Sequence, residues 1–588
     1  MKKALLFLIL PILGNCLNIL FYVSVIAQSH IPFHNTAIKI LLDRGHTVDL
    51  VVAHLNEMVK VHFPAGVRQN YTFGYEDPNF WSKNALHLFN IFEKKPIPIA
   101  EFLAFDDLTY QLCENVVRNP NLLEYIKKGK YDIGLSSDYD PCANTIMHAG
   151  GVPVKASMIP TPMFQPQIYS AGLPTLASLY GTVLYPKSDE SFFSRLFHLV
   201  RHTYNIYFVT PKLMNRYNSL LSKTFGPTFP TVEEIERNVD LVLVNSNEII
   251  EKPRPISHKI KYIGGMGKKK AQPLSKEFNG ILDSAPKGVV LFSFGTQVPT
   301  KKVPIEVRRN CVAAFKKFPE FLFLWKYDNL TDDAEMFENV QNIHRVEWLP
   351  QTDLLGDHRV KAFISHMGLN SYLELAAAGV PVLSIPLFID QHHNALNAAA
   401  REIGVTVEKD EVTVENMVDA LQKLLFDPKY ERNAKMISKM MLEKPEQSEK
   451  LFVDWVEYAA RNPGLHKILN LPGAELTPFW YYSGKRITVK LGEKMKFCFL
   501  CILMTISATF GQEDEQSGMT AFESIRRLKE CIDLIDKPEF KKMCEGKLGK
   551  EKDECVEKFT KKMMPKLNAC IERSRRPRTI PLPHTEEL

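Results

Sequence analysis

The residues best suited to chemistry lie between positions 348 and 391. Val360–Ser365 is a short apolar run that predicts a buried strand, and Gly368 follows it closely. Residues 370–378 are rich in Leu and Ala and predict a helix that ends at Gly379. A strand, a tight turn and a helix N-terminus together form an anion site, because free backbone N–H groups and the helix dipole point at the bound anion.

Side chains around this turn could complete a site for a nucleotide sugar. His366 lies just before Gly368 and adds a hydrogen-bond donor beside the anion. Glu374 lies about one helical turn further on, where its carboxylate could accept hydrogen bonds from a sugar diol. Trp348 offers a flat aromatic face on which a base could stack.

This pattern resembles the signature of the UDP-sugar-dependent glycosyltransferases, in particular the animal UDP-glucuronosyltransferases. The resemblance implies that Trp348 stacks on uracil, that Gln351 meets the nucleoside and that Glu374 binds the ribose hydroxyls. It implies that the sugar hydroxyls are bound by Asp390 and Gln391. The residues that it assigns to the diphosphate are His366, Gly368, Asn370 and Ser371.

Length and composition indicate a multidomain globular protein. A chain of 588 residues is too long for a single core, so we expect at least two domains. The net charge of +6 is small for this length and gives no reason to expect a nucleic-acid partner. Between residues 17 and 497 the chain has only three cysteines, Cys113, Cys142 and Cys311. Three are too few for a disulfide scaffold, so we expect them to be buried free thiols.

The N-terminus has the pattern of a secretory signal peptide, which we expect to span residues 1–16. Two lysines precede an apolar run at residues 4–13 that is too short to cross a bilayer. Sequons at Asn70 and Asn329 are compatible with passage through the secretory pathway. We therefore expect the lumen of the endoplasmic reticulum, with membrane association or secretion as alternatives.

Alternating strand and helix patterns predict two parallel sheets. The first series has a strand at residues 19–25, a helix at 33–44 and a strand at 47–53. Two further strands follow, at residues 132–135 and Leu241–Val244. The second series has a strand, a helix, a strand and the signature segment, at residues 288–294, 304–318, 321–325 and 348–391. Gly45 is placed to end the first helix.

We therefore expect an α/β protein with two facing Rossmann-like domains, the GT-B architecture that the resemblance also implies. Residues 17–250 would form an acceptor-binding domain, and residues 286–483 a UDP-sugar-binding domain with closing helices. Residues 251–285 contain Pro and Gly and would link the two. Ligands of such sheets bind at the carboxyl ends of strands, so the site should lie between the domains.

His30 is the candidate catalytic base. It lies after the first strand and directly before the first helix, where a helix N-terminus disfavours the protonated form, although a structural loop histidine is the alternative. The resemblance places the base in such a turn and an Asp in a later loop to orient it. Strict alignment puts Ser137 at that position, with Asp138 and Asp140 close by, and we assign Asp138.

The reaction that the resemblance implies is inverting transfer of glucuronate or glucose from a UDP-sugar to a small lipophilic acceptor. His30 would take the proton of the acceptor hydroxyl as its oxygen attacks C1 of the sugar. No cofactor is required, and no metal site is expected, because adjacent residues such as His392 and His393 do not converge easily on one ion.

A non-catalytic nucleotide-sugar or small-molecule binding protein of the same fold is the rival interpretation. Two observations motivate it. The candidate orienting residue, Asp138, is one position away from the aligned site. Animal family members also often have Gly where this chain has Met367 and Ser371, near the diphosphate.

After Ser483 the chain departs from the family pattern, which continues there with a transmembrane helix that is not found here. Residues 484–511 contain an apolar run at 497–510 that is too short to span a bilayer and has the pattern of a second signal peptide. Residues 512–588 carry four cysteines and predict a small helical disulfide domain. Three explanations fit this C-terminal part of the chain: a sequence that joins the products of two neighbouring genes, a true fusion protein, or a degraded membrane anchor at residues 497–510. We favour the first.

Overall fold

The computed structural model of the chain describes residues 16–75, 77, 81, 92, 99–174, 192–267, 270–296 and 298–472. Most of the expected signal peptide and the whole of the predicted four-cysteine domain lie outside the described residues. The chain divides into two compact units, residues 1–486 and 487–588, and everything below concerns the first.

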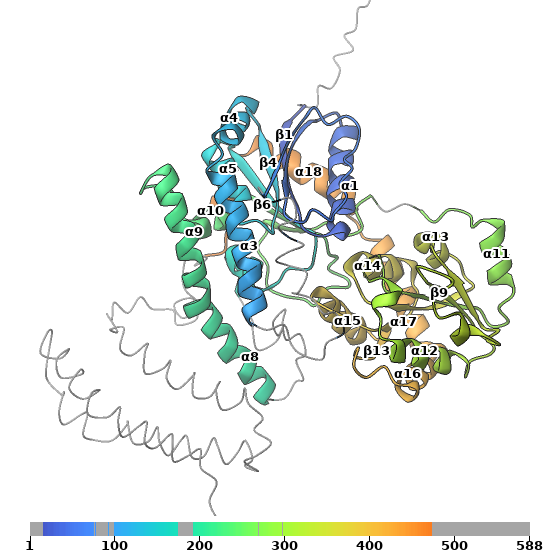
Figure 1. The fold of residues 1–588 in the computed structure, drawn as a ribbon. Coiled ribbons are helices and arrows are strands. Elements are labelled where there is room, and N and C mark those ends of the chain that lie inside the picture. Colours follow the sequence, from blue (N-terminus) through green and yellow to red (C-terminus); the bar gives the residue numbers. More distant parts are fainter. Residues whose placement is uncertain are drawn as a thin grey trace, which may run out of the picture. The chain divides into compact units, whose positions relative to one another are not determined.

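The first half of this unit is built on a parallel sheet of seven strands in the order β3-β2-β1-β4-β5-β6-β7 (Figure 1). The strands are β1 (Asn18–Val25), β2 (Thr47–His54), β3 (Gln69–Gly74), β4 (Ile133–Ser137), β5 (Val154–Ile159), β6 (Leu241–Val244) and β7 (Ile260–Tyr262). The predicted strand–helix–strand unit is confirmed as β1, α1 (Ile31–Asp43) and β2, and Gly45, with φ +91°, follows the helix end.

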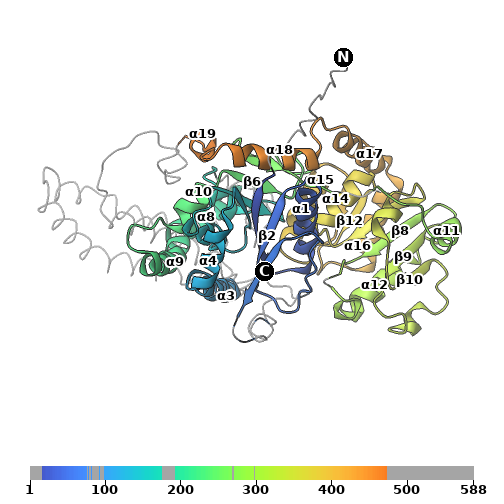
Figure 2. The same ribbon diagram turned by 90° about the horizontal axis from the view of Figure 1, so that it is seen from above.

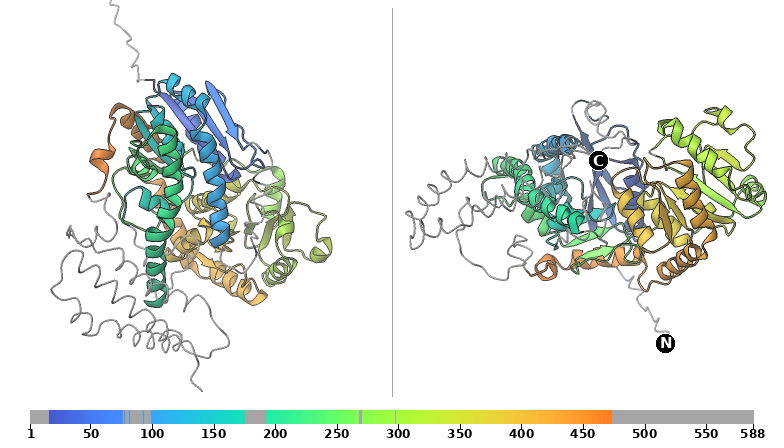
Figure 3. Two further views of the ribbon diagram at one scale, coloured as in Figure 1. Left: turned by 60° about the vertical axis from the view of Figure 1, so that its left-hand side comes forward. Right: turned by 90° about the horizontal axis from the view of Figure 1, so that it is seen from below.

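Helices cover both faces of this sheet because successive residues of a strand point to opposite sides. In β1, Ile19, Phe21 and Val23 pack with α1 and α18 (Ser448–Arg461), whereas Leu20 and Tyr22 pack in a second core. The helices over that second face include α3 and α9, which run side by side (Figures 1 and 3). Between β3 and β7 the described residues form the α-helices α3 (Ile99–Val117), α4 (Pro120–Gly129), α5 (Ala143–Ala149), α6 (Gln165–Ser170), α8 (Phe192–Tyr204), α9 (Thr210–Phe225) and α10 (Val232–Arg237).

The second half is built on a parallel sheet of six strands in the order β10-β9-β8-β11-β12-β13. The strands are β8 (Val289–Ser293), β9 (Leu322–Lys326), β10 (Ile343–Val346), β11 (Val360–Ser365), β12 (Val382–Ser384) and β13 (Gly404–Thr406). The helices are α11 (Lys276–Asp283), α12 (Ile305–Phe315), α13 (Gln351–Leu355), α14 (Leu369–Ala378), α15 (Asp390–Ala400), α16 (Val414–Phe426) and α17 (Pro428–Leu442). In the central strands Ser365 pairs with Ser293 and Ser384, so their carboxyl ends form one edge.

The packing of the two halves does not follow the boundaries drawn from the sequence. β7 lies inside the segment 251–285 that was expected to be a linker, and it pairs with β6 of the first sheet. α18 follows the second sheet in the chain but lies against the first half, near α1 (Figure 2), and its apolar residues belong to the same core as those of β1 and α1. Neither β7, with three residues, nor α18 has a local sequence pattern that tells which of the two sheets it packs with.

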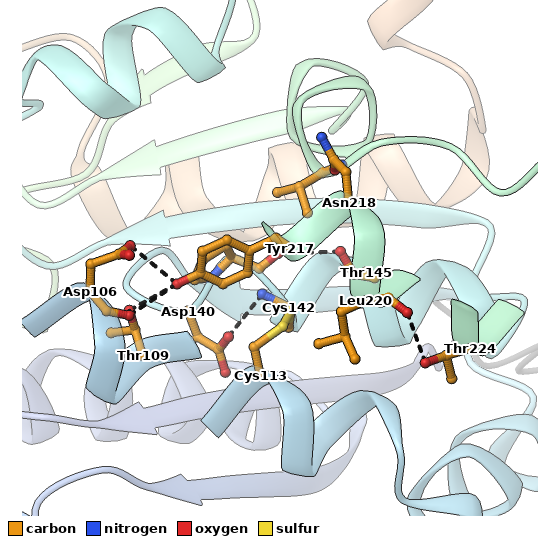
Figure 4. The surroundings of a disulfide bond; sticks show 12 residues. Asp106, Thr109, Cys113, Asp140, Cys142, Thr145, Tyr217, Asn218, Leu220 and Thr224 are labelled. Atoms are coloured by element: carbon orange, nitrogen blue, oxygen red, sulfur yellow. Dashed lines mark hydrogen bonds between the residues drawn. A yellow bond between two sulfur atoms is a disulfide. The ribbon is translucent and has the colours of Figure 1, made fainter. Parts of the chain in front are cut away.

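A disulfide joins Cys113 in α3 to Cys142 at the start of α5 (Figure 4). The expectation of buried free thiols was therefore wrong for this pair, whereas Cys311 is a buried free thiol. The two Cα atoms are 5.3 Å apart across a sequence separation of 29 residues, which sequence spacing alone does not reveal. None of the helices within the described ranges has the length and apolar character needed to span a bilayer.

Candidate active site

His30 ends a short 3₁₀ turn, Gln28–His30, and is the N-cap residue of α1. Its ring stacks on Tyr139, with the ring centroids 5.0 Å apart and the planes inclined by 15°. Its Nδ1 is buried and has no hydrogen-bond partner among the described residues. Burial lowers the pKa of His30 to about 4, so the imidazole is neutral near pH 7 and can accept a proton.

Asp138 and Asp140 follow β4 and have different surroundings. Both carboxylate oxygens of Asp140 are engaged, because the Tyr22 hydroxyl donates to Oδ2 at 2.5 Å and the Cys142 N–H donates to Oδ1 at 2.8 Å. The Oδ2 of Asp138, by contrast, is buried without a partner in the described part of the chain. Burial raises the pKa of Asp138 to about 7, and a hydrogen bond with Gln167 opposes that rise.

Nδ1 of His30 and Oδ2 of Asp138 are both buried and without a hydrogen-bond partner in the described ranges. Tyr139 connects them, because it follows Asp138 in the chain and its ring covers His30. The Tyr139 hydroxyl is hydrogen-bonded to the Thr161 hydroxyl, at 2.9 Å. A protonated Nδ1 needs an acceptor and a carboxylate oxygen needs a donor, so each group lacks what the other supplies.

The turn between β11 and α14 has the predicted form of strand, tight turn and helix N-terminus. Gly368 is the N-cap residue of α14, and Gly379, with φ +72°, ends the helix. Met367 has φ +66°, a left-handed backbone that favours Gly, and its N–H donates to the Ser365 hydroxyl at 3.1 Å. Its side chain is completely buried in the core of the second half, so packing offsets the backbone cost at a position where family members often have Gly.

His366 is held between two glycines at the edge of the second sheet. A Cβ at Gly295 would lie 2.7 Å from the His366 ring carbon Cε1, and a Cβ at Gly368 would lie 2.7 Å from Nε2. Both positions therefore need Gly to leave room for the ring. Burial lowers the pKa of His366 to about 4, while a hydrogen bond with the Ser293 backbone opposes the change, so the ring is neutral near pH 7.

Candidate nucleoside residues come together at the start of α13 and on α14. Nε2 of Gln351 donates to Oε2 of Glu374 at 2.5 Å and to the Ser371 hydroxyl at 3.3 Å. Trp348 lies in the loop before α13 and is 66% exposed, which leaves its ring accessible to a base. These four residues share one region of the second half.

Asn370 joins this region to the turn that carries His30. Its Nδ2 donates to the carbonyl oxygen of Ser29 at 3.3 Å, and its Oδ1 accepts from Nδ2 of Asn245 at 3.4 Å. Asn245 directly follows β6, at the carboxyl end of the first sheet. The start of α14 is therefore in contact with the residue that precedes the candidate base.

Asp390 is the first residue of α15 and also lies close to the candidate base. Its carboxylate accepts from Nδ2 of Asn394 at 3.0 Å. Burial raises the pKa of Tyr139, whose ring covers His30, and the negative charge of Asp390 adds to this rise. Burial raises the pKa of Asp390 to about 6, against hydrogen bonds that include the backbone N–H of Leu369 in α14. Asp390 thus lies among the base turn, α14 and α15.

Gln391 differs from Asp390 in its surroundings. Its side chain is only 3% exposed and is hydrogen-bonded to the loop that precedes α15. Its Oε1 accepts from the backbone N–H groups of Leu387, at 2.9 Å, and Phe388, at 3.2 Å. The structure therefore places Gln391 next to the proposed sugar residue Asp390, with its carbonyl oxygen already engaged.

The two histidines that follow are in separate pairs. His392 lies 3.6 Å from Glu408, whereas Nε2 of His393 lies 2.6 Å from Oε1 of Glu251. Within the described residues, no group of three or more His, Cys, Asp or Glu side chains is arranged to hold a metal ion.

A family model described as UDP-glucoronosyl and UDP-glucosyl transferase matches residues 20–511. The chain belongs to this family. The putative UDP-glucuronosyltransferase ugt-50 of Caenorhabditis elegans is 29% identical over 463 residues, which cover 76% of this chain and 86% of that protein. Human UDP-glucuronosyltransferase 2B7 is 26% identical over 485 residues, which cover 80% and 89% of the two chains.

Solved structures agree with the fold. The crystal structure of CalG4, the calicheamicin glycosyltransferase, aligns with a TM-score of 0.52 at 16% identity and covers 76% of this chain and 98% of that one. The two parallel sheets with their helices are thus the GT-B fold. As a member of the UDP-glycosyltransferase family, the protein is a glycosyltransferase that uses a UDP-sugar.

Sequence reasoning missed four residues that shape this UDP-glycosyltransferase site: Tyr139, Asn245, Glu251 and Gly295. Asn245 could have been found, since it directly follows a predicted strand and ligand-binding residues gather at carboxyl ends of strands. The other three act by contacts through space and have no motif of their own.

Proposed function

We propose that the protein is an inverting glycosyltransferase that moves glucuronate or glucose from a UDP-sugar to the hydroxyl group of a small lipophilic acceptor. One observation carries the proposal. A neutral, partly unsatisfied histidine, His30, follows Ser29, whose carbonyl oxygen is held by Asn370 at the N-terminus of α14. A proton acceptor and an anion-binding helix end therefore meet at one place, as displacement of a nucleotide requires.

The transfer is a single displacement. His30 takes the proton from the acceptor hydroxyl while that oxygen forms a bond to C1 of the sugar and the bond from C1 to UDP breaks. Attack on the face opposite UDP inverts the configuration at C1. The ionised Asp138 stabilises the imidazolium that forms on His30. The N–H groups at the start of α14 and the neutral His366 receive the charge that develops on the leaving diphosphate.

The donor occupies the second half of the protein in this proposal. Trp348 stacks on uracil, while Gln351 and Glu374, already hydrogen-bonded to each other, bind the nucleoside and its ribose. Asp390, beside the base turn, binds hydroxyls of the sugar, together with Gln391 if its amide NH₂ is used rather than its engaged carbonyl oxygen. Gly368, Asn370 and Ser371 hold the diphosphate. The signal pattern of residues 1–16 supports action in the lumen of the endoplasmic reticulum.

The test measures UDP release and glycoside formation with a panel of UDP-sugars and phenols. His30→Ala should lower kcat by about 10²–10⁴-fold and leave the affinity for UDP unchanged. His358→Ala, at a histidine whose side chain is 90% exposed, is the matched control and should behave like the wild type.

Two outcomes would contradict the proposal. Saturable binding of a UDP-sugar by the wild type without turnover of any phenol would indicate the non-catalytic binding protein. An equal loss of kcat and of UDP affinity in His30→Ala would make His30 a structural residue.

A further inference from the structure

A short segment of the first half is inserted into the second half. Residues 247–251 are separated from the end of β6 by two residues and form a tight turn, here called the interdomain peg. The side chain of Asn247 accepts from the N–H of Ile249 at 2.9 Å, and its backbone carbonyl accepts from the N–H of Glu251 at 2.9 Å. Ile250 is completely buried in the core of the second sheet.

Side chains of α14 and α15 hold three consecutive carbonyl oxygens of the peg. The Tyr372 hydroxyl of α14 donates to Ile250 at 3.3 Å. Arg401, at the end of α15, donates to Ile249 at 2.5 Å and also to the carbonyl oxygen of Glu251. The peg therefore lies between the helix assigned to the diphosphate and the helix assigned to the sugar, and contacts both.

The carboxylate of Glu251 is the most heavily bonded group of the peg. Its side chain is buried, and Oε1 lies 2.6 Å from Nε2 of His393 and 3.4 Å from Nδ2 of Asn397, both on α15. Its Oε2 accepts from the Ser246 hydroxyl at 3.0 Å. Burial would raise the pKa of Glu251, but His393, these hydrogen bonds and the nearby Arg254 lower it to about 2, so the group is ionised.

His393 connects this carboxylate to the start of α15. Asp390, His393 and Asn397 are spaced three and four residues apart, so they lie along one face of the helix. Burial raises the pKa of Asp390, and the neighbouring His393 is among the groups that oppose this rise. Asn394, on the same face, donates to Asp390 at 3.0 Å and to the Met367 carbonyl in the turn before α14 at 2.9 Å.

We propose that Glu251 is a positioning residue for the donor sugar: through His393 it fixes α15 against α14, so that Asp390 faces the sugar while α14 holds the diphosphate. The inference rests on the proposed function, because it assigns Asp390 to the sugar. It adds that a residue outside the signature segment, in the loop between β6 and β7 of the first sheet, controls how the donor is held.

The test compares Glu251→Gln and His393→Gln with the wild type. Both substitutions keep a hydrogen-bonding side chain of similar size; Glu251→Gln removes the carboxylate and His393→Gln removes the imidazole. Calorimetry measures the affinities for UDP, UDP-glucose and UDP-glucuronate, and thermal unfolding checks the fold of each variant. UDP-sugar binding should weaken about tenfold in either variant, while UDP binding changes less than about twofold. The double variant should be no worse than either single one, because both remove the same contact.

His392→Gln is the matched control, since it removes a neighbouring histidine of α15 that pairs with Glu408 and not with the peg. It should leave both affinities unchanged. Equal weakening of UDP and UDP-sugar in Glu251→Gln and His393→Gln, with turnover retained by the wild type, would overturn this inference alone. If Glu251→Gln does not fold, the affinities of His393→Gln for UDP and UDP-sugar test the same contact, because His393 is its partner on α15. Absence of UDP-sugar binding by the wild type would overturn the proposed function and the inference together.

Discussion

Asp138→Asn should mainly lower the catalytic rate, whereas Asp140→Asn should mainly lower the stability of the fold. The two carboxylates lie two residues apart after the same strand, and both are buried enough to have raised pKa values. Only Asp140 has both oxygens engaged, by Tyr22 and Cys142. Asp138 keeps an unpartnered oxygen among the described residues, and the residue after it, Tyr139, stacks on His30.

The structure sets the size of each effect. In Asp140→Asn one acceptor oxygen is lost, so either the Tyr22 hydroxyl or the Cys142 N–H is left without a partner in a buried site. That change should lower the free energy of unfolding by about 1–3 kcal/mol. Asp138→Asn removes no hydrogen bond at Oδ2, so it should affect stability less than Asp140→Asn does. It should lower kcat, by a smaller factor than the about 10²–10⁴-fold expected for removal of the base itself.

The pH dependence of kcat/KM gives the sharper readout. His30 must be neutral to act as a base, and its pKa of about 4 places that requirement well below neutral pH. Asp138 must be ionised to stabilise the imidazolium, and its pKa of about 7 means that the ionised fraction grows as the pH rises through about 7. The wild-type rate should therefore fall as the pH falls below about 7. In Asp138→Asn the fall near pH 7 should be gone, which leaves a lower rate that falls only as Asp390, with a pKa of about 6, and then His30, with a pKa of about 4, become protonated.

The assay is initial-rate kinetics from pH 4 to 9 with one UDP-sugar and one phenol, together with thermal unfolding of each variant. An unchanged acid limb near pH 7 in Asp138→Asn would refute the assignment of Asp138. So would a larger loss of kcat in Asp140→Asn than in Asp138→Asn at equal stability.

Further substitutions and a truncation test the rest of the assignment. Glu374→Ala should weaken UDP and UDP-sugar equally, by roughly 1.5–3 kcal/mol, as measured by calorimetry. Asp390→Asn should weaken UDP-sugar and spare UDP, because UDP has no sugar, and equal effects on both ligands would sink that assignment. Replacement of Cys113 and Cys142 by Ser should lower the free energy of unfolding by about 2–4 kcal/mol in denaturant titrations, and reduction of the wild type should have the same effect. A chain that ends after Ser483 should still bind UDP, because every proposed site residue precedes that position, and loss of binding would contradict the division.

Elements with strong local signals were predictable from the sequence. β6 and β11 have the bounds that were expected, because each is a run of apolar residues that is almost wholly buried between two layers of helices. α14 begins one residue before its predicted start and ends at Gly379, since a left-handed Gly is a local stop signal. The secondary structure of these segments is determined by the types of a few neighbouring residues in the sequence.

The disulfide and the two glycines around His366 show the limit of such reasoning. Cys113 and Cys142 are paired only because α3 and α5 pack together, so three scattered cysteines gave no signal. Gly295 lies far from His366 in the chain, and its need to be Gly comes from a ring that approaches through space. The donor signature was predictable because its members are close in sequence, whereas these partners are not.

The family match also bears on the C-terminal part of the chain. It reaches residue 511 and so includes the apolar run at 497–510, which lies beyond Ser483. The assignment of that run as a second signal peptide stays a prediction. A separate origin for residues 512–588 stays a prediction, and transcript reads across the segment 484–511 test it directly.

The order of the chain and the order of the packing differ most at the borders of the two halves. Ile250 comes from the loop between β6 and β7 of the first sheet but is buried in the core of the second, whereas Phe452 follows the second sheet and is buried in the core of the first. Each half therefore completes its core with a segment from the other side of the border. Because the segment around Ile250 touches both helices assigned to the donor, substitutions there should change donor binding although they lie about a hundred residues before the signature. Preference among donor sugars is then expected to depend on residues 247–251 as well as on Asp390, and exchange of this short segment between family members, with donor affinities as the readout, separates the two contributions.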